Sequence, residues 1–475
     1  MPFNEEYFNS KDFKELLNHY EASMKEGEHP FMDADELVDI ADYYNHFGRN
    51  DEANDVIEHA LQLYPGATLP NVFMARQALM DCDYELARHY SDCIEDHDDP
   101  DYHYLQAEIL IAEGNIEEAD IYLRDYEKSV DMDEYRDFVK DCANLYIDYG
   151  ESQKAYEWMM RSPGDDTDDF KELMAHILFT LGKFKDSERI FKELIDNNPY
   201  SSRYWKALAG IQLLNEDYGN AVTSSEYAIA INPTDAEGIL TKANALLNLE
   251  NFEEAEKYYQ RYCEINPDDE AGPLHRGICL IYRGKHQEAL EFLLQAEAIA
   301  EPESPFLPQI YQEQAFCYSS LKQPQKSLEV LDKIDSKNND PNNLLVLKGH
   351  ILLENGLNEE AEKMWKQAMI NSNYSTTIML RIVVSLYDNH YVEACYHILK
   401  KSFEHFKDDQ DFCPQGYPYM ALCCHDLGYK EEFLHYLELA IKKNPQKTKS
   451  TIGFLFPKEI DVKDYYKYIA QKIDE

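Results

Sequence analysis

Small and large side chains recur along this chain with a period of 34 residues, most clearly between Asp168 and Pro267. Each period contains two stretches with apolar residues at helical spacing, and each stretch carries one small residue where two helices can cross closely. An asparagine–proline pair closes each period, because proline disfavours helical geometry in the residue before it. In order, the small pairs and closing prolines are Ala175 with Ser187 and Pro199, Ala209 with Ala221 and Pro233, and Ala243 with Ala255 and Pro267.

The same spacing of small residues continues toward both ends of the chain and predicts about twelve helix–turn–helix units. A single hairpin cannot bury its own apolar face, so these units must stack on their neighbours. The eleventh unit, residues 375–409, is degenerate around Ala394, and Ala421 and Ala440 mark the last unit. The remaining small pairs are Ala41 with Ala53, Ala75 with Ala87, Ala107 with Ala119, Ala143 with Ala155, Gly277 with Ala289, Ala315 with Ser327, and Gly349 with Ala361.

The central repeats resemble the tetratricopeptide repeat family. The resemblance implies an all-α fold, a right-handed α-solenoid of about twelve helix–turn–helix repeats with capping helices at both ends. It also implies a non-catalytic function in binding other proteins, as a scaffold or assembly factor. The residues that match the family's marked positions are Trp205, Leu208, Ala209, Ala221, Ala228 and Pro233 in one repeat, and Ala243, Leu246, Ala255, Tyr259 and Pro267 in the next.

The positions of the repeats divide the chain into five segments. A helix from about Asn9 to Glu26, capped by Ser10, is expected to cover the open face of the first repeat. A proline-rich insertion lengthens one period from 34 to 38 residues, which makes it the expected place of a bend, and a second insertion is expected from Lys407 to Pro418. The segments are 1–33 (N-terminal capping helix), 34–301 (repeats one to eight), 302–308 (proline-rich insertion), 309–447 (repeats nine to twelve) and 448–475 (C-terminal segment and capping helix).

Acidic residues dominate the first part of the chain. Residues 1–200 carry 49 acids against 17 bases, whereas the remaining 275 residues carry 42 acids against 28 bases. The negative electrostatic field of these acids repels nucleic acid and anionic lipid, so neither is an expected partner. The acids either form a solvated surface or steer a basic partner toward the chain, and both interpretations remain open.

The apolar content and the cysteines bear on the expected compartment. No run of 18 apolar residues is present, so membrane insertion is not expected. The first residues lack the basic and apolar regions of an export signal, and the ten scattered cysteines suggest no disulfide framework. These features predict a cytoplasmic protein whose cysteines are reduced and mostly buried.

The resemblance implies that positions two, five, nine and twelve of each repeat line a concave groove that holds a protein or peptide partner. The groove changes from mixed polar to mostly apolar, which suits an amphipathic helix or an extended peptide with large side chains. Alternatively, some of these aliphatic residues pack between adjacent first helices, or the chain's own segment Ile452–Phe456 occupies the groove. The groove positions are Glu172, His176, Phe179, Arg203, Lys206 and Leu213; Leu240, Asn244, Leu247, Leu274, Ile278 and Ile281; and Gln312, Phe316, Val346, His350, Leu353, Met379, Val383 and Leu386.

No motif in the sequence predicts catalysis or a cofactor. Some members of the family grip a C-terminal carboxylate with lysine, asparagine and arginine, but here Asn244 has Leu240 where the lysine would stand. The histidine and cysteine clusters lack the spacing of metal ligands, and Asp168 is better explained as a helix N-cap than as a cation ligand. The alternative functions are a regulatory or sensor solenoid with its hinge at residues 301–308, and an enzyme with a site in the groove.

Overall fold

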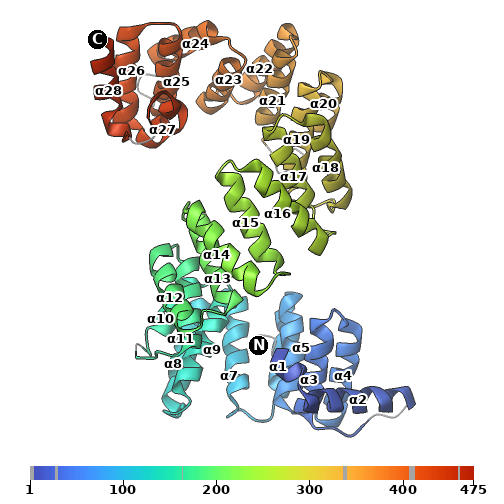
Figure 1. Ribbon diagram of the computed structural model, residues 1–475. Coiled ribbons are helices and arrows are strands. Elements are labelled where there is room, and N and C mark those ends of the chain that lie inside the picture. Colours follow the sequence, from blue (N-terminus) through green and yellow to red (C-terminus); the bar gives the residue numbers. More distant parts are fainter. Residues whose placement is uncertain are drawn as a thin grey trace. The chain divides into compact units, whose positions relative to one another are not determined.

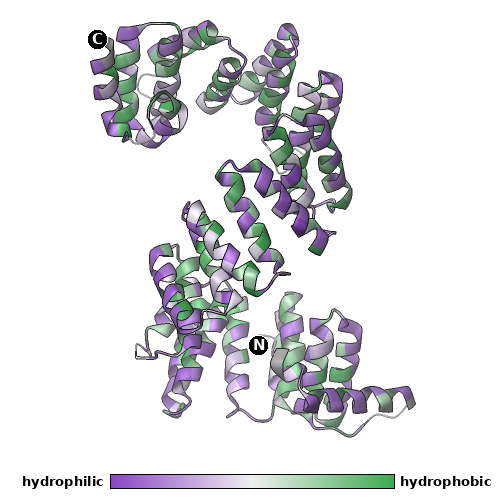
Figure 2. Cartoon of the chain, viewed as in Figure 1, coloured by the Kyte–Doolittle hydropathy of each residue, from purple (hydrophilic) through white to green (hydrophobic). Residues whose placement is uncertain are grey.

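The computed structural model describes residues 5–26, 30–162, 164–334, 340–405, 412–457 and 460–474, and every regular element in these ranges is a helix (Figure 1). The chain divides into two compact units, a first unit of Met1–Glu216 and a second unit of Asp217–Glu475. Most helices carry apolar residues along one side and polar residues along the other (Figure 2), which is the pattern expected for stacked amphipathic hairpins. The prediction of an all-α solenoid of repeats is confirmed.

The first unit contains two N-terminal helices, five complete hairpins and one further helix. Consecutive hairpins contact each other, as the stacking argument requires. The elements are α1 (Glu5–Phe8), α2 (Lys11–Glu26), α3 (Ala34–His46), α4 (Asn50–Leu63), α5 (Thr68–Met80), α6 (Tyr84–Cys93), α7 (Pro100–Ala112), α8 (Ile116–Tyr126), α9 (Tyr135–Asp148), α10 (Ser152–Met159), α11 (Asp168–Thr180), α12 (Phe184–Asn197) and α13 (Ser202–Leu214).

The second unit contains one helix, six complete hairpins and two terminal helices. The sixth repeat thus contributes its first helix, α13, to the first unit and its second helix, α14, to the second unit. The elements are α14 (Tyr218–Ile231), α15 (Ala236–Asn248), α16 (Phe252–Ile265), α17 (Ala271–Tyr282), α18 (His286–Ile299), α19 (Leu307–Ser320), α20 (Pro324–Leu331), α21 (Pro341–Glu354), α22 (Asn358–Asn371), α23 (Thr376–Asp388), α24 (Val392–His405), α25 (Phe412–Asp426), α26 (Lys430–Lys443), α27 (Pro445–Ile452) and α28 (Tyr465–Asp474).

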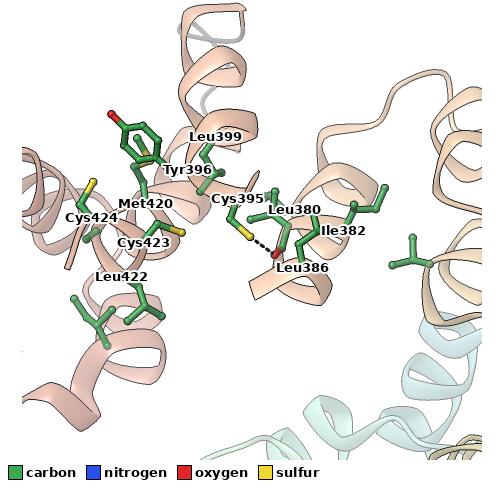
Figure 3. Packing of buried hydrophobic residues seen from close by; sticks show 14 of the residues in the cluster. Leu380, Ile382, Leu386, Cys395, Tyr396, Leu399, Met420, Leu422, Cys423 and Cys424 are labelled. Atoms are coloured by element: carbon green, nitrogen blue, oxygen red, sulfur yellow. Dashed lines mark hydrogen bonds between the residues drawn. The ribbon is translucent and has the colours of Figure 1, made fainter. Parts of the chain in front are cut away.

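The small residues lie where the two helices of a hairpin cross. Ala41 and Ala53 are fully buried, and the Ser187 hydroxyl donates a hydrogen bond of 2.7 Å to the Ala175 carbonyl across the crossing. In the eleventh repeat the crossing residue differs from the prediction by one position. Cys395 is fully buried at the crossing, and the predicted Ala394 is not. The Cys395 thiol donates to the Val383 carbonyl at 3.3 Å (Figure 3). Cysteine is small enough for this position, which alanine or serine fills in the repeats marked by small pairs.

The proline-rich insertion lies inside the second unit. Helices α18 and α19 share an apolar cluster across it, in which Leu293 and Ile310 are fully buried, and Ser304 in the insertion donates a hydrogen bond of 2.6 Å to Glu270. The division into two units falls at Glu216 instead, within the sixth repeat. A bend at residues 302–308 therefore stays a prediction.

The second expected insertion is partly helical. Residues 407–411 lie outside the described ranges, but Phe412–Pro418 form the first turns of α25, with Pro418 inside the helix. The described part of the predicted insertion is therefore helical, and the insertion itself stays a prediction. The N-cap of α11 is Thr167 rather than Asp168, since the Thr167 hydroxyl accepts a hydrogen bond from the Phe170 N–H and Asp168 is already helical.

Both ends of the described chain cap the neighbouring repeat. In α2, Phe13 and Tyr20 are buried in the apolar cluster of the first repeat, and the Ser10 hydroxyl accepts a hydrogen bond from the Phe13 N–H, as expected for the cap. At the other end, Ile452 and Phe456 are buried in the cluster of the last repeats, where the Phe456 ring stacks on Tyr465 with centroids 3.8 Å apart. The segment Ile452–Phe456 is thus part of the terminal core, and the interpretation that it occupies the groove is wrong.

Candidate functional site

A well-formed pocket lies on the first helices of consecutive repeats in each of the two units. The pocket of the first unit, here called the acidic pocket, has a volume of about 590 Å³ and lies on α1, α3, α5 and the start of α7. Its walls combine apolar and charged side chains, so it can contact the aliphatic part and the polar end of a ligand at once. The residues that define its chemistry are Tyr7, Phe8, Val38, Asp39, Asp42, Leu69, Val72, Phe73, Arg76 and Asp101.

The carboxylates of the acidic pocket are poorly compensated. Enclosure by the pocket walls raises the pKa of Asp39, Asp42 and Asp101, and repulsion from neighbouring acids adds to the effect. Arg76 and His46 line this pocket, and the Nε atom of Arg76 donates to Glu108 at 2.8 Å. Much of the arginine's charge is therefore used by a carboxylate on α7, and the pocket remains negative.

Helix α1 forms one wall of the acidic pocket. The Tyr7 hydroxyl donates a hydrogen bond to Asp39, and burial together with this bond raises the pKa of Tyr7 to about 12. The Phe8 ring lies 4.7 Å from Phe13 and 5.9 Å from Tyr43, measured between ring centroids. A short segment of the chain is thus already seated against the first-helix face through aromatic packing and one donor on a carboxylate.

The pocket of the second unit, here called the mixed pocket, has a volume of about 440 Å³ and lies on α19, α21 and α23. Apolar side chains alternate with hydrogen-bonding groups along its walls, and acidic and basic residues are both present. The residues that define its chemistry are Gln312, Asn343, Leu344, Val346, Leu347, His350, Arg381, Val384, Ser385 and Asp388.

Hydrogen bonds fix the polar groups of the mixed pocket. The His350 Nδ1 atom lies 2.9 Å from the Ser385 hydroxyl and 3.3 Å from the Asn389 amide nitrogen. An amide nitrogen can only donate, so Nδ1 is the acceptor and the imidazole carries its proton on Nε2. The Oδ1 atom of Asn343 is buried and has no hydrogen-bond partner among the described residues. The pocket therefore offers an oriented imidazole and one unsatisfied acceptor.

Three of the predicted groove residues meet in the mixed pocket, and three others meet in the first unit. Gln312, Val346 and His350 line the mixed pocket together. Separately, Glu172 on α11 pairs with Arg203 on α13 at 2.6 Å and lies 3.8 Å from His176. The expectation that residues of neighbouring first helices come together therefore agrees with the geometry at both places, although it does not establish that a partner binds there.

The other predicted groove residues are engaged within the chain to different degrees. The Asn244 side chain accepts a hydrogen bond of 2.6 Å from the Tyr259 hydroxyl. Leu274 and Ile278 are buried in the cluster shared by α17, α18 and α19, which is the inter-helix packing that the alternative interpretation describes. Phe316 is 39% exposed and so remains accessible on α19. Half-buried members of the predicted set include Phe179, Lys206, Leu213, Leu240, Leu247 and Ile281.

The acidic pocket was missed because the groove positions were assigned only from the fifth repeat onward. Applied to the first repeat, the same rule selects Val38 and Asp42, and applied to the second it selects Val72 and Arg76. In the eleventh repeat the lining residues include Val384 and Asp388, whereas the predicted Val383 and Leu386 are buried. The one-residue register error at Cys395 accounts for the shift from Val383 to Val384, whereas Asp388 lies two residues beyond Leu386 and is not explained by it. The predicted Met379 is half-buried and is not among the residues that line the pocket.

Other chemistry can be assessed only over the described ranges. There, no group of three or more histidine, cysteine, aspartate or glutamate side chains is arranged to hold a metal ion. None of the helices described is both long and apolar enough to cross a bilayer. All ten cysteines are free, and burial raises the pKa of thiols such as Cys279, to about 12, so this thiol stays protonated near neutral pH.

Comparisons with known proteins agree with the helical hairpins. Two family models described as Tetratricopeptide repeat match residues 173–236 and 212–276. The protein O-mannosyl-transferase TMTC1 of Mus musculus is 23% identical over 138 residues, which are 28% of this chain and 14% of that protein. The chain thus matches only a small part of that relative's length.

Several solved structures also resemble parts of the chain. A tetratricopeptide repeat protein from Parabacteroides merdae is 16% identical and covers 53% of this chain and 98% of its own, with a TM-score of 0.41. A thermophilic tetratricopeptide repeat protein of Thermus thermophilus is 20% identical and covers 39% and 100%, with a TM-score of 0.32. MamA from Desulfovibrio magneticus is 16% identical and covers 34% and 94%, with a TM-score of 0.33.

The residues matched by the two family models run from α11 to α17. They include the stretch in which the small pairs, the closing prolines and the hairpins keep the strict 34-residue period. Residues 173–276 are therefore tetratricopeptide repeats.

Proposed function

We propose that this chain is a non-catalytic scaffold that binds an extended peptide segment of a partner protein on the first helices of its repeats. The observation that carries the proposal is the mixed pocket, where Gln312, Val346 and His350 from consecutive first helices converge on one cavity. Binding of protein partners is the general use of tetratricopeptide repeats, and the match to TMTC1 covers too little of that enzyme to support catalysis here.

The chemistry of the mixed pocket favours an extended peptide. Leu344, Leu347 and Val384 offer an apolar surface for one large side chain. The amide oxygen of the exposed Gln312 can accept a backbone N–H, and the Nε2 proton of His350 can be donated to a backbone carbonyl. An extended peptide presents both groups at regular intervals, whereas a helix has already used them internally.

Rigidity of the site supports useful affinity. The His350 imidazole is held by Ser385 and Asn389, so little side-chain entropy is lost when a ligand binds. We further propose a cytoplasmic location, because ten free cysteines, most of them buried, suit a reducing compartment.

The test is selection of peptides from a displayed random library on the full chain, followed by calorimetric titration of the synthesised peptides. Val384→Asp places a charge in the apolar wall and is expected to weaken binding at least about tenfold, or ~1.4 kcal/mol. Ile370→Asp is the matched control, since Ile370 is 58% exposed on the second helix α22 and does not line the pocket.

Both variants are first compared with the parent by circular dichroism and thermal unfolding. The proposal is overturned if the library yields no peptide that binds, or if Val384→Asp and Ile370→Asp have equal effects on the selected peptides. Selection of helical peptides only would leave binding intact but contradict the extended conformation.

A further inference from the structure

We infer that the acidic pocket is a second docking surface, specific for a partner segment in which basic residues alternate with apolar ones. It rests on the proposed scaffold function and specifies the chemistry of one partner. Lysine or arginine head groups would lie on Asp42 and Asp101, while their aliphatic stems and the neighbouring apolar side chains would pack on Val38 and Val72.

The first argument is the shape and composition of the pocket. Val38, Leu69, Val72 and Phe73 form apolar walls around a cavity of about 590 Å³ on three consecutive first helices. Such a surface is large enough for two or three side chains of a peptide. A purely cationic ligand would leave these walls unused, and a purely apolar one would bury the carboxylates without a partner, which is costly.

The second argument is the unbalanced charge. The first unit carries 50 acids and 19 bases, a net of −31, against −15 for the second unit. Among the described residues, no lysine or arginine lies within ion-pair distance of Asp42 or Asp101. Arg76, which lines the same pocket, forms its ion pair with Glu108 at 2.8 Å. Cationic side chains from a partner would relieve the mutual repulsion of these acids.

The third argument is that a peptide segment already occupies the edge of this surface. Tyr7 and Phe8 of α1 line the pocket, with the Tyr7 hydroxyl on Asp39 and the Phe8 ring against Tyr43. This contact has the two components expected of the partner, apolar packing and a proton donor on a carboxylate. The first-helix face is thus able to hold a short chain segment, and Asp42 and Asp101 are the carboxylates that α1 leaves unused.

The experiment uses a fluorescein-labelled octapeptide of alternating lysine and leucine as the probe, titrated with the full chain and followed by fluorescence anisotropy. The Asp42→Asn and Asp101→Asn double variant is expected to weaken binding by at least about tenfold, since two charge-assisted contacts are lost. An octapeptide of alternating glutamate and leucine is expected not to bind.

The matched control removes the same amount of charge from the same two repeats. Asp51 on α4 and Glu118 on α8 are exposed acids on second helices, outside the pocket. The Asp51→Asn and Glu118→Gln double variant is expected to change the affinity by less than about twofold, because exposed charges are screened by salt. Equal losses in both double variants would overturn the inference, since the probe would then respond only to the net charge.

Failure of the inference can be distinguished from failure of the proposed function. Val384→Asp is expected to leave the lysine–leucine probe unaffected, and the pocket double variant is expected to leave the library-selected peptides unaffected. If only the library-selected peptides bind, the acidic pocket is not a docking surface and the scaffold function stands. If no peptide of either kind binds, both proposals are wrong.

Discussion

The acidic pocket and the mixed pocket occupy the same place in the repeat but differ in chemistry. Position eight of the first helix lies at the crossing and is buried in both units, as Ala41 and Ala315 illustrate. Position nine follows it in the chain yet faces the pocket, and there the residue is Asp42 in one unit and His350 in the other. Packing thus restricts position eight to small residues, whereas position nine carries residues of different chemistry in the two pockets.

This difference explains how one fold can recognise unlike partners. Successive repeats place position nine on neighbouring first helices, so residues of this position from two repeats can contact one ligand. In the first two repeats these residues are Asp42 and Arg76, whereas in repeats ten and eleven they are His350 and Val384. The first set forms a charged surface and the second an apolar and hydrogen-bonding one, while the hairpins beneath them are alike.

The largest expected effect comes from Gly349→Ala. This change tests whether the mixed pocket depends on the crossing of α21 and α22, where Gly349 is the small residue. A Cβ atom at Gly349 would lie 2.2 Å from Trp365 Nε1, and this indole donates to the Val346 carbonyl at 3.1 Å. We expect the second unit to lose about 1–3 kcal/mol of stability through overpacking. Hydrogen exchange in α21 and α22 should rise, and the library-selected peptides should bind more weakly.

The control for this change is Gly210→Ala on α13 of the first unit. No atom lies within 4 Å of a Cβ atom placed at Gly210. Alanine has the higher helix propensity, so this variant should be neutral or more stable by up to about 1 kcal/mol. Binding of the lysine–leucine probe should be unchanged in Gly349→Ala. A loss of probe binding there would mean that the two pockets are energetically coupled.

The helical hairpins and their crossings could be predicted from the sequence because close packing requires a small residue at each crossing, and this residue recurs at a fixed spacing. Only a small residue fits where helices approach closely, so Ala175 and Ser187 identify the crossing without any structure. Cys395 was missed because it satisfies the same requirement with a different side chain, and the error moved the groove positions of that repeat by one residue.

The candidate sites were harder to predict for a physical reason. Position nine faces a cavity in some repeats and packs between helices in others, as His350 and Ile278 show, so its residue type follows no common pattern along the chain. The wall formed by Tyr7 and Phe8 was also unpredictable, since it depends on where α1 packs after the repeats have formed. The sequence could indicate which positions face a groove, but not which of them enclose a cavity.

The second prediction concerns pH and separates the acidic pocket from ordinary surface charge. Asp42 is near Asp39 and Arg76, and Asp101 is near Asp99, Asp35 and Arg76. Because burial raises the folded-state pKa values of these acids, they should take up protons at a higher pH than exposed carboxylates do when the pH is lowered below 7. The lysine–leucine probe should then bind roughly threefold to tenfold more weakly, with anisotropy titrations as the measurement.

The stability of the first unit should change in the opposite direction. A raised carboxyl pKa means that ionisation costs folding free energy, a cost absent below the unfolded-state pKa and complete above the folded-state pKa. The first unit should therefore become less stable as the pH rises through this window. The Asp42→Asn and Asp101→Asn variant should show a smaller slope of unfolding free energy against pH than the parent, measured by urea unfolding. Identical slopes would contradict the conclusion that the folded state raises the pKa values of Asp42 and Asp101.

The third prediction is a smaller effect at the wall of the acidic pocket. Tyr7→Phe removes the donor to Asp39 while keeping the aromatic ring. Asp39 then becomes available to a cationic side chain, so the lysine–leucine probe should bind about twofold to threefold more tightly. Tyr200→Phe is the control, because Tyr200 is 82% exposed and does not line the pocket. Weaker binding in Tyr7→Phe would indicate that the hydroxyl assists the ligand instead.

The smallest expected effect tests whether the crossings of the two units are equivalent. Ser187 in the first unit and Ser327 in the second are fully buried, and each donates to the carbonyl twelve residues earlier, at 2.7 and 2.6 Å. Replacing either serine with alanine removes one hydrogen bond, but the carbonyl lies within a helix and keeps its partner four residues later, so no acceptor is left unsatisfied. Each change should therefore cost at most about 1 kcal/mol in urea unfolding. The two values should agree within about 0.5 kcal/mol, because alanine already fills this position at Ala53 and Ala87. A cost above about 2 kcal/mol in only one unit would mean that its hairpins depend on the hydroxyl, and the difference between the units would then extend from the pockets into the packing beneath them.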